Sequence, residues 1–345
     1  MNLSGRILRG PEFEPIDGRV VVEDGRIAAV EETSDPDDRI ISPAFVNAHT
    51  HLGDSIAKEA GRGLSLAELV APPDGLKHRL LRNAPRDEMV AAMRDSLTFA
   101  LRTGTVACID FREGGVDGVS RLDEAATDLP IGTYAFGRES IDVLETATGF
   151  GASGANDDDF EHERTAAHEA GKLFGIHAGE ADSSDLNPAL DLSPDFLVHV
   201  VHPEARHVDR IADAEIPVVV CPRSNLVTDV GLPPVTELAS KTTVALGTDN
   251  VMLNSPSMFR EMEFVAKHAD LDAPAVLRMA TRNGAALVGR DDGLIEVGRP
   301  ANLLVLDGES PNLAGVRDPV RAVVRRAGAG DVESVLVNGD PVSTS

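Results

Sequence analysis

Residues 43–54 read Pro43-Ala44-Phe45-Val46-Asn47-Ala48-His49-Thr50-His51-Leu52-Gly53-Asp54, an apolar, strand-like run that ends in His-x-His. Successive side chains of a strand point to opposite faces, so His49 and His51 project from the same face. Two imidazoles placed in this way can bind one metal ion. The run therefore predicts a strand that ends in a pair of metal ligands.

Strands and helices alternate after this run. Apolar runs bounded by turn residues predict strands, and apolar residues three and four apart predict helices. The further expected strands are 105–111, 131–136, 146–152, 173–177, 196–199, 217–221 and 243–247. The expected helices are 85–103, 116–128, 157–170, 204–214, 235–240, 257–269 and 274–288. If the glycine-rich segment 146–152 is the fourth strand, eight strand–helix units result, which predict an α/β fold of the (β/α)₈ TIM-barrel type.

Short strands lie on both sides of the expected barrel. Asp24-Gly25 between two apolar runs predicts a hairpin near the start of the chain, and residues 302–307 and 334–339 read as strands near its end. Neither end can bury a sheet face by itself, so we expect the two ends to pair with each other. The expected domains are a small composite β-sandwich of residues 1–42 plus 299–345 and a barrel of residues 43–298.

The charge of the chain limits the kinds of partner. Among 345 residues, 32 are Lys or Arg and 57 are Asp or Glu, a net charge of −25, which repels nucleic acids and anionic membranes. We therefore expect a small-molecule substrate, with no nucleic-acid and no membrane partner. Scarce lysine and abundant acids favour adaptation to high salt, where ions screen the self-repulsion. An unusually acidic mesophilic protein is the alternative.

The cellular compartment is expected to be the cytoplasm. The N-terminus lacks the basic and apolar pattern of a signal peptide. Cys108 and Cys221, the only cysteines, lie in apolar runs and are expected to be buried thiols in a reducing compartment, with no catalytic role. A homo-oligomer is the default expectation for the assembly.

The carboxyl ends of the expected strands carry the chemistry, because functional residues of TIM barrels gather there. Four strands end in histidine or carboxylate side chains, namely His49 and His51, His177 and Glu180, His199, and Asp249. Three neutral imidazoles and one carboxylate suit Zn²⁺ or another borderline divalent ion that keeps one position open for water. The candidate metal ligands are His49, His51, His177 and Asp249.

The remaining strand-end groups suit catalysis. A bound metal ion lowers the pKa of its water toward neutrality and so provides a hydroxide nucleophile, and Asp249 could also accept the proton of that water. Glu180, three residues beyond His177, could carry a proton to the leaving group. His199 could polarise the bond under attack or stabilise the developing oxyanion.

Each of these assignments has an alternative. Glu180 could be a solvated loop charge, Asp249 could cap a helix or form an Asx turn, and His202 could replace His199. Pro203 after His202 indicates that the chain already leaves the strand there. The other histidines fall in helices or loops and are expected at the surface: His78, His162, His168, His207 and His268.

The ordered set of motifs resembles the amidohydrolase superfamily, and in particular its aminohydrolase branch of deaminases and chlorohydrolases. The resemblance rests on His49-Thr50-His51, His177-x-x-Glu180, His199 and Gly247-Thr248-Asp249, in the family order. Residues 221–225 (Cys-Pro-Arg-Ser-Asn) resemble a strand-seven signature of that branch. Residues 298–306 and 337–339 resemble its return into the small β domain, so the resemblance covers nearly the whole chain.

The resemblance implies a mononuclear metal site. Binuclear members use a carboxylated lysine at the end of strand four, and this chain has no lysine between Lys77 and Lys172. One divalent ion per chain is implied, with Zn²⁺ expected and Fe²⁺ as the alternative. The mechanism it implies is attack of hydroxide on an amidine-like ring carbon, protonation of the ring nitrogen by Glu180 and departure of ammonia.

Substrate contacts are less defined by the sequence. Candidates at strand ends and loops are Arg112, Arg138, His202 and Asn225, although surface ion pairing is an alternative for the arginines. The chain has one Tyr, no Trp and 11 Phe, which leaves few rings to stack on a base. The segment from residue 52 to 84 looks shorter than in many deaminases of this branch.

The leading hypothesis is a metal-dependent hydrolase that deaminates a nucleoside, a nucleobase or a related small heterocycle. Hydrolysis of another bond, in a cyclic amide or between carbon and halogen, is the second hypothesis. A non-catalytic metal-binding protein is the third, and the presence of Glu180 and His199 argues against it because a structural zinc site needs neither.

Overall fold

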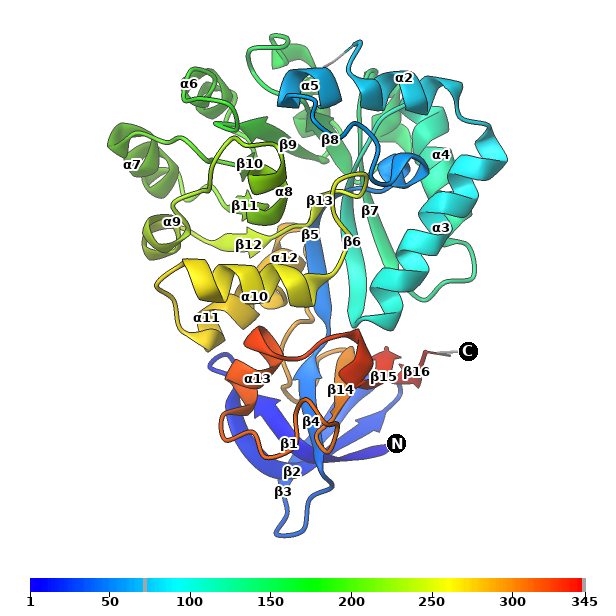
Figure 1. Ribbon diagram of the computed structural model, residues 1–345, viewed down its shortest axis with the longest axis vertical. Helices are drawn as coiled ribbons and strands as arrows, with labels where there is room; N and C mark the ends of the chain where they lie inside the picture. Colours follow the sequence, from blue (N-terminus) through cyan, green and yellow to red (C-terminus); the bar gives the residue numbers. More distant parts are fainter. Residues whose placement is uncertain (71–72, 343–345) are drawn as a thin grey trace.

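Two sheets organise the structure, a computed structural model that describes residues 1–70 and 73–342 (Figure 1). The larger sheet has nine strands in the order β12-β11-β10-β9-β8-β7-β6-β5-β13, and every neighbouring pair is parallel. Its strands are β5 (Phe45–His51), β6 (Thr105–Arg112), β7 (Gly132–Gly137), β8 (Gly149–Ala152), β9 (Leu173–Ala178), β10 (Phe196–His199), β11 (Val218–Val220), β12 (Val244–Leu246) and β13 (Asp249–Asn250).

The eighth strand closes this sheet into a barrel. β12 and β13 are separated only by Gly247 and Thr248, and β13 pairs with β5 at Asp249↔Thr50. A side chain on Gly247 would lie 2.7 Å from Cβ of His49, so glycine permits the close approach of the eighth strand to the first. The predicted TIM barrel is thereby confirmed, and β8 is the fourth strand expected within residues 146–152.

Helices surround the barrel in Figure 1. Those of seven or more residues in the described part of 52–288 are α2 (Leu76–Asn83), α3 (Arg86–Arg102), α4 (Gly115–Ala126), α5 (Glu161–Glu169), α7 (Ala205–Asp213), α9 (Val235–Lys241), α10 (Met258–His268) and α11 (Ala273–Met279). The shorter segments are η1 (Leu52–Ala57), α1 (Leu66–Val70), η2 (Ile141–Glu145), α6 (Leu186–Asp191), α8 (Pro222–Val227) and α12 (Arg282–Leu287). No helix within the described residues is both long and apolar enough to cross a membrane.

Two helix predictions were wrong in extent. The expected helix 274–288 is divided into α11 and α12, because Thr281 leaves helical geometry with φ −130 and ψ −94 and its hydroxyl donates to the Leu277 carbonyl. The expected helix 157–170 begins only at Glu161. Before it, the carboxylate of Asp159 accepts the Glu161 N–H, and such local bonds compete with the helix.

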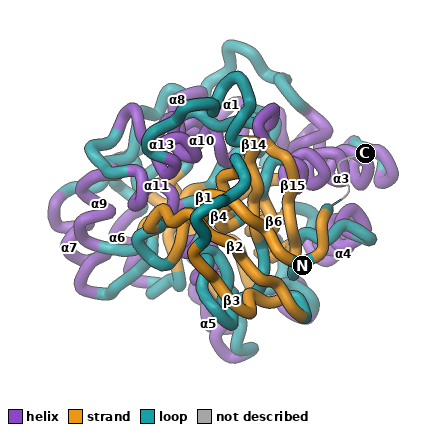
Figure 2. Tube along the Cα trace, turned by 90° about the horizontal axis from the view of Figure 1, so that it is seen from below, coloured by secondary structure: helices purple, strands orange, loops and turns teal. Residues whose placement is uncertain are grey.

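The second sheet joins the two ends of the chain, as predicted. Its order is β16-β15-β14-β4-β1-β2-β3, and β4 pairs with β14 in antiparallel register, Leu303 opposite Pro43. Figure 2 shows these strands side by side in the view from below. Their bounds are β1 (Asn2–Arg9), β2 (Glu14–Glu23), β3 (Arg26–Glu32), β4 (Arg39–Pro43), β14 (Leu303–Asp307), β15 (Val332–Val337) and β16 (Asp340–Pro341).

This terminal sheet curls around an apolar core of its own. The predicted hairpin turn has left-handed backbone at Asp24 (φ 48) and Gly25 (φ 75), which matches the twist of its strands. A side chain on Gly25 would lie 2.9 Å from the carbonyl oxygen of Asn338, so the two edges of the sheet meet. Within the described residues the expected sandwich is one curled sheet, and residues 343–345 lie outside them. The proposed domain boundaries stay a prediction.

Helix α10 carries a buried carboxylate that makes the stability depend on pH. Glu261 is 0 % exposed and accepts the backbone N–H of Arg223, and burial raises the pKa of Glu261 to about 7. The pKa of Glu261 is 4.5 in the unfolded chain and about 7 in the folded protein. At a pH between these two values, Glu261 is deprotonated in the unfolded chain but still protonated in the folded protein. The contribution of Glu261 to stability therefore falls as pH rises through this window.

We expect Glu261→Gln to remove that dependence. From about pH 5 to about pH 8, the wild type should lose on the order of 3 kcal/mol relative to the variant. Urea unfolding of both proteins at several pH values measures the difference. A difference that is constant with pH would contradict the assignment.

Candidate active site

The two histidines of the His-x-His run converge on one carboxylate. His49 and His51 end β5 on the same face, as the strand period predicts. Both side chains and the carboxylate of Asp249 are buried. Nε2 of His49 lies 3.2 Å from Oδ1 of Asp249, and Nε2 of His51 lies 3.6 Å from the same oxygen. The parallel pairing of β5 with β13 brings Asp249 to this position.

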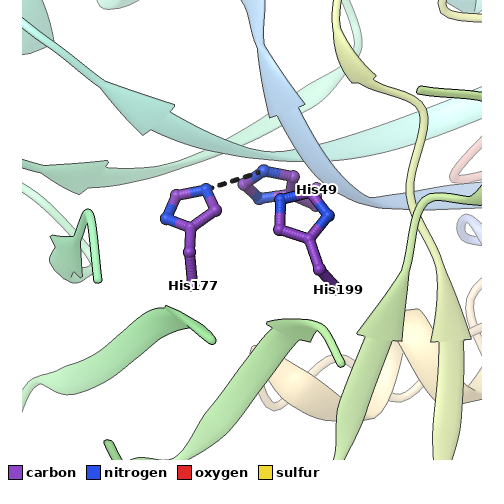
Figure 3. Close-up of side chains that lie close together, drawn as sticks. All are labelled: His49, His177 and His199. Atoms are coloured by element: carbon purple, nitrogen blue, oxygen red, sulfur yellow. Dashed lines mark hydrogen bonds between the residues drawn. The ribbon is translucent and has the colours of Figure 1, made fainter. Parts of the chain in front are cut away.

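His177 and His199 complete the cluster (Figure 3). Nε2 of His177 lies 3.3 Å from Nε2 of His49, and the ring of His199 is centred 5.3 Å from the ring of His177. Nδ1 of His177 lies 2.8 Å from the carbonyl oxygen of Ala152, to which it can only donate. The lone pair of Nε2 of His177 therefore faces His49.

The cluster fits a divalent metal ion. Two sets of ligand atoms lie within 4.8 Å of one another and share His49: one adds His177 and His199, the other His51 and Asp249. Burial lowers the pKa of His49 and of His177, and burial together with Lys77 lowers that of His51 to about 3. Neutral imidazoles whose ring nitrogens converge beside a carboxylate form a donor set typical of Zn²⁺.

Asp249 is held as an acceptor. Burial works to raise its pKa, but the hydrogen bond from His49 and the surrounding imidazoles outweigh burial and hold the pKa well below its usual value. The hydroxyl of Ser224 donates to Oδ2 of Asp249. The backbone of Asp249 is left-handed (φ 58), a strained geometry that is concentrated at functional sites.

Glu180 lies beside this cluster in an environment that favours its protonated form. It follows β9, its Oε2 lies 3.6 Å from Nε2 of His199, and burial raises its pKa. Asn225, at the start of α8, donates to Oε1 of Glu180 at 3.3 Å and lies 3.1 Å from Nδ1 of His199. Asn225 therefore orients both groups.

A second set of charges, centred on Glu113, supports His51. Oε1 of Glu113 lies 3.1 Å from Nδ1 of His51, 2.7 Å from Nζ of Lys77 and 3.1 Å from the guanidinium of Arg138. Lys77 also pairs with Asp54 at 3.1 Å. Because Nε2 of His51 faces Asp249, the tautomer that can bind metal there carries its proton on Nδ1 and donates it to Glu113.

We expect Glu113→Gln to weaken metal binding by about 10–100-fold, because it removes the carboxylate that orients and polarises His51. Competition with a chromogenic chelator measures the dissociation constant of Zn²⁺. Glu139→Gln is the matched control, since Glu139 is exposed and its carboxylate accepts a backbone bond from Gly114. Equal affinity in the wild type and Glu113→Gln would contradict the expectation.

The four candidate substrate contacts lie in different surroundings. Arg138 borders the cavity above the cluster, and Asn225 lies behind it, in contact with the lining residues Glu180 and His199. Arg112 is 1 % exposed and its guanidinium pairs with Asp110 and Glu113, so it is buried and does not line this cavity. His202 is exposed, and its Nε2 lies 2.7 Å from the carbonyl oxygen of Val230.

Two histidines expected at the surface are elsewhere. His207 is 0 % exposed, and its Nδ1 accepts the backbone N–H of Glu204 at the start of α7. His78 is half-buried and borders the cavity beside Lys77. Sequence reasoning also missed Lys77 as a site residue. The one signal for Lys77 in the sequence was that lysine is rare in this chain, which has five. Glu113 has a clearer signal, because it directly follows the barrel strand β6.

The cavity above the cluster has a volume of about 310 Å³. Its lining includes Lys77, Arg138, His177, Glu180, His199 and Asp249. The barrel is closed, and a cluster of histidines and one aspartate that suits a metal ion lies at the carboxyl ends of its strands. This arrangement is typical of metal-dependent hydrolases. The model of the Amidohydrolase family matches residues 40–342, and the chain belongs to this family.

Curated relatives agree with this membership, and solved structures share the fold. A protein of Methanothermobacter thermautotrophicus, whose provisional name is aminohydrolase, is 34% identical over 97% of both chains. The 5-methylthioadenosine/S-adenosylhomocysteine deaminase of Halobacterium salinarum is 28% identical over 99% of this chain and 91% of that one. The zinc complex of atrazine chlorohydrolase from Arthrobacter aurescens has a TM-score of 0.83 at 21% identity, covering 99% of this chain and 94% of that one, and shows the same fold.

Proposed function

We propose that the protein catalyses the metal-dependent hydrolytic deamination of a small nitrogen heterocycle. The observation that carries this proposal is the pairing of Glu180, whose pKa is raised, with the buried cluster of His49, His51, His177 and Asp249 in one cavity. Such a site holds a proton donor and a proton acceptor at pH 7 within the same pocket.

The bound metal ion would lower the pKa of a water molecule at its open position toward neutrality. His49, His51, His177 and Asp249 would hold that ion, and Oδ1 of Asp249 would accept the proton of the attacking water. Glu180 would donate its proton to the ring nitrogen next to the carbon under attack. His199, oriented by Asn225, would stabilise the oxygen that forms on that carbon. With the new carbon–oxygen bond in place, the bond to the exocyclic amine breaks and ammonia leaves with the proton that Asp249 had accepted. The hydroxyl proton on the new oxygen returns to Glu180, which leaves a carbonyl group on the ring and restores both carboxyl groups.

The substrate class is drawn from the relatives. Curated relatives at 28% identity are named for deamination of 5-methylthioadenosine and S-adenosylhomocysteine, so adenine nucleosides are the first compounds to test. Arg138 and Lys77 at the cavity wall would contact polar substituents of the substrate. Zn²⁺ is the proposed ion, one per chain, because the single donor cluster contains no lysine at the end of β8.

The surroundings in which the enzyme works follow from its charge. A net charge of −25 fits a cytoplasm of high salt concentration, in which screening reduces self-repulsion. The same charge disfavours nucleic acid as a substrate. A homo-oligomer stays the default for the assembly.

Release of ammonia from a panel of compounds tests the proposal. The panel contains adenosine, 5-methylthioadenosine, S-adenosylhomocysteine, guanine, a cyclic urea and a chlorinated triazine, assayed with zinc-loaded protein in molar KCl. Ammonia from an amino heterocycle is the expected result. Chloride release or ring opening without any ammonia would overturn deamination in favour of another hydrolysis, and no product from metal-loaded protein would overturn it as well.

A further inference from the structure

Five basic residues of this acidic protein lie together at one place outside the active site. A cavity of about 670 Å³ lies along α13 (Pro319–Arg325) and the end of α10. Its lining contains five cationic side chains, Lys267, Arg317, Arg321, Arg325 and Arg326, but only one carboxylate, Asp318. In a chain with 57 acids and 32 bases this local excess runs against the overall composition.

The arginines of this cavity are unusual in their lack of partners. Most arginine side chains of the protein pair with a carboxylate or donate to a carbonyl. Arg317, Arg321 and Arg325 make no side-chain hydrogen bond or ion pair with any residue in the described parts of the chain. Arg62 is the one other arginine in this state among residues 1–70 and 73–342. The carboxylate of Asp318 is engaged in accepting the backbone N–H of Arg321.

Two of these arginines share one face of a helix. Arg321 and Arg325 lie four residues apart within α13, the spacing that places helical side chains on one face, about 5–6 Å apart at Cβ, and Arg317 lies just before the helix, next to its N-cap Asp318. Like charges at this spacing destabilise a helix when nothing compensates them. The apolar face of α13 is buried, with Val320 and Val323 in the core, and the helix lies between α10, α11 and the terminal sheet (Figure 1).

We propose that this cavity, here called the arginine cavity, binds a small anion with two adjacent phosphate groups. Guanidinium groups bind phosphate oxygens in pairs of parallel hydrogen bonds, and the long side chains of Arg321 and Arg325, one helical turn apart, can converge on the linked phosphates of a diphosphate. The ligand is small because the field of the −25 charge opposes a polyanion, whereas at about 0.1 M salt charges beyond ~10 Å are screened and the local cations dominate. The diphosphate is either free or part of a nucleotide.

Isothermal titration of the full-length, zinc-loaded protein tests the proposal, in the lowest salt that preserves the native circular dichroism spectrum. The probes are inorganic diphosphate, ADP and AMP. Diphosphate should bind once per chain, and more tightly than AMP. Affinity for ADP above that for diphosphate identifies a nucleotide as the source of the anion, and the reverse order identifies the free anion.

The double variant Arg321→Gln, Arg325→Gln should bind diphosphate at least about tenfold more weakly, since each lost guanidinium removes charge-assisted hydrogen bonds. Arg62→Gln is the matched control, because it removes an equally unpartnered, exposed arginine elsewhere, and it should bind as the wild type does. The substituted side chains of Arg62, Arg321 and Arg325 are exposed, so both variants should keep the fold. Absence of diphosphate binding, or equal binding by the double variant, overturns the proposal. If diphosphate does not bind and the double variant alone changes the oligomeric state by sedimentation, the cavity is an interface between copies and the proposal is likewise overturned.

Discussion

Glu180→Gln should lower kcat for deamination by about 10²–10⁴-fold, because glutamine fills the same space but has no proton to give to the ring nitrogen. Glu180 suits this role since burial raises its pKa and its Oε1 accepts a hydrogen bond from Asn225. A glutamine oxygen can accept that same bond, so substrate binding and the fold should change little. Zinc content, measured by metal analysis, should also match that of the wild type.

The loss should appear in kcat more than in KM, because the proton is delivered only in the transition state. Glu169→Gln is the control: it makes the same chemical change on the exposed end of α5 and should leave kcat unchanged. Steady-state kinetics of the three proteins on one substrate measures the effect. Should Glu180→Gln keep more than a tenth of the wild-type kcat, Glu180 would not be the proton donor.

The parts of the site that sequence alone predicts are those set by strand period and strand order. The period of two places His49 and His51 on one face, and the rule that barrel chemistry lies at carboxyl strand ends brings His177, His199 and Asp249 to the same region. The structure places these side chains in one buried cluster. Such arguments need only the position of a residue within its own strand.

The support around the cluster could not be predicted, because it depends on how distant segments pack. Lys77 reaches Glu113 from a short helix after an irregular segment, and no periodicity describes that path. Arg112 is predicted as a substrate contact or a surface ion pair, yet its side chain is buried. The absence of a side chain on Gly53 makes room for its guanidinium, because a Cβ there would lie 2.1 Å from it. Propensity likewise favours one helix over 274–288, whereas the side-chain bond of Thr281 divides it.

Removal of the metal should abolish activity and lower the thermal stability. Without the ion, ring nitrogens of His49 and His177 lie 3.3 Å apart beside the Asp249 carboxylate with no cation to hold them together, which is unfavourable for buried polar groups. At free Zn²⁺ about 1,000-fold above its dissociation constant, binding should stabilise the fold by ~4 kcal/mol. For a chain of this size that corresponds to a rise in Tm of several degrees, measured by calorimetry before and after chelation.

Adding Zn²⁺ back to the metal-free protein tests this prediction more directly. One equivalent of Zn²⁺ per chain should restore both kcat and Tm, since the ligand sets of the site share His49 and surround one position. Asp249→Asn, which keeps the shape of the side chain and its contact with Ser224, removes the only carboxylate of the set and should bind Zn²⁺ more weakly than the wild type. The exposed Asp213→Asn at the end of α7 is the control and should take up zinc normally. A requirement for two equivalents would contradict the single-metal site, and full activity of chelated, metal-free protein would contradict the metal-dependent mechanism itself.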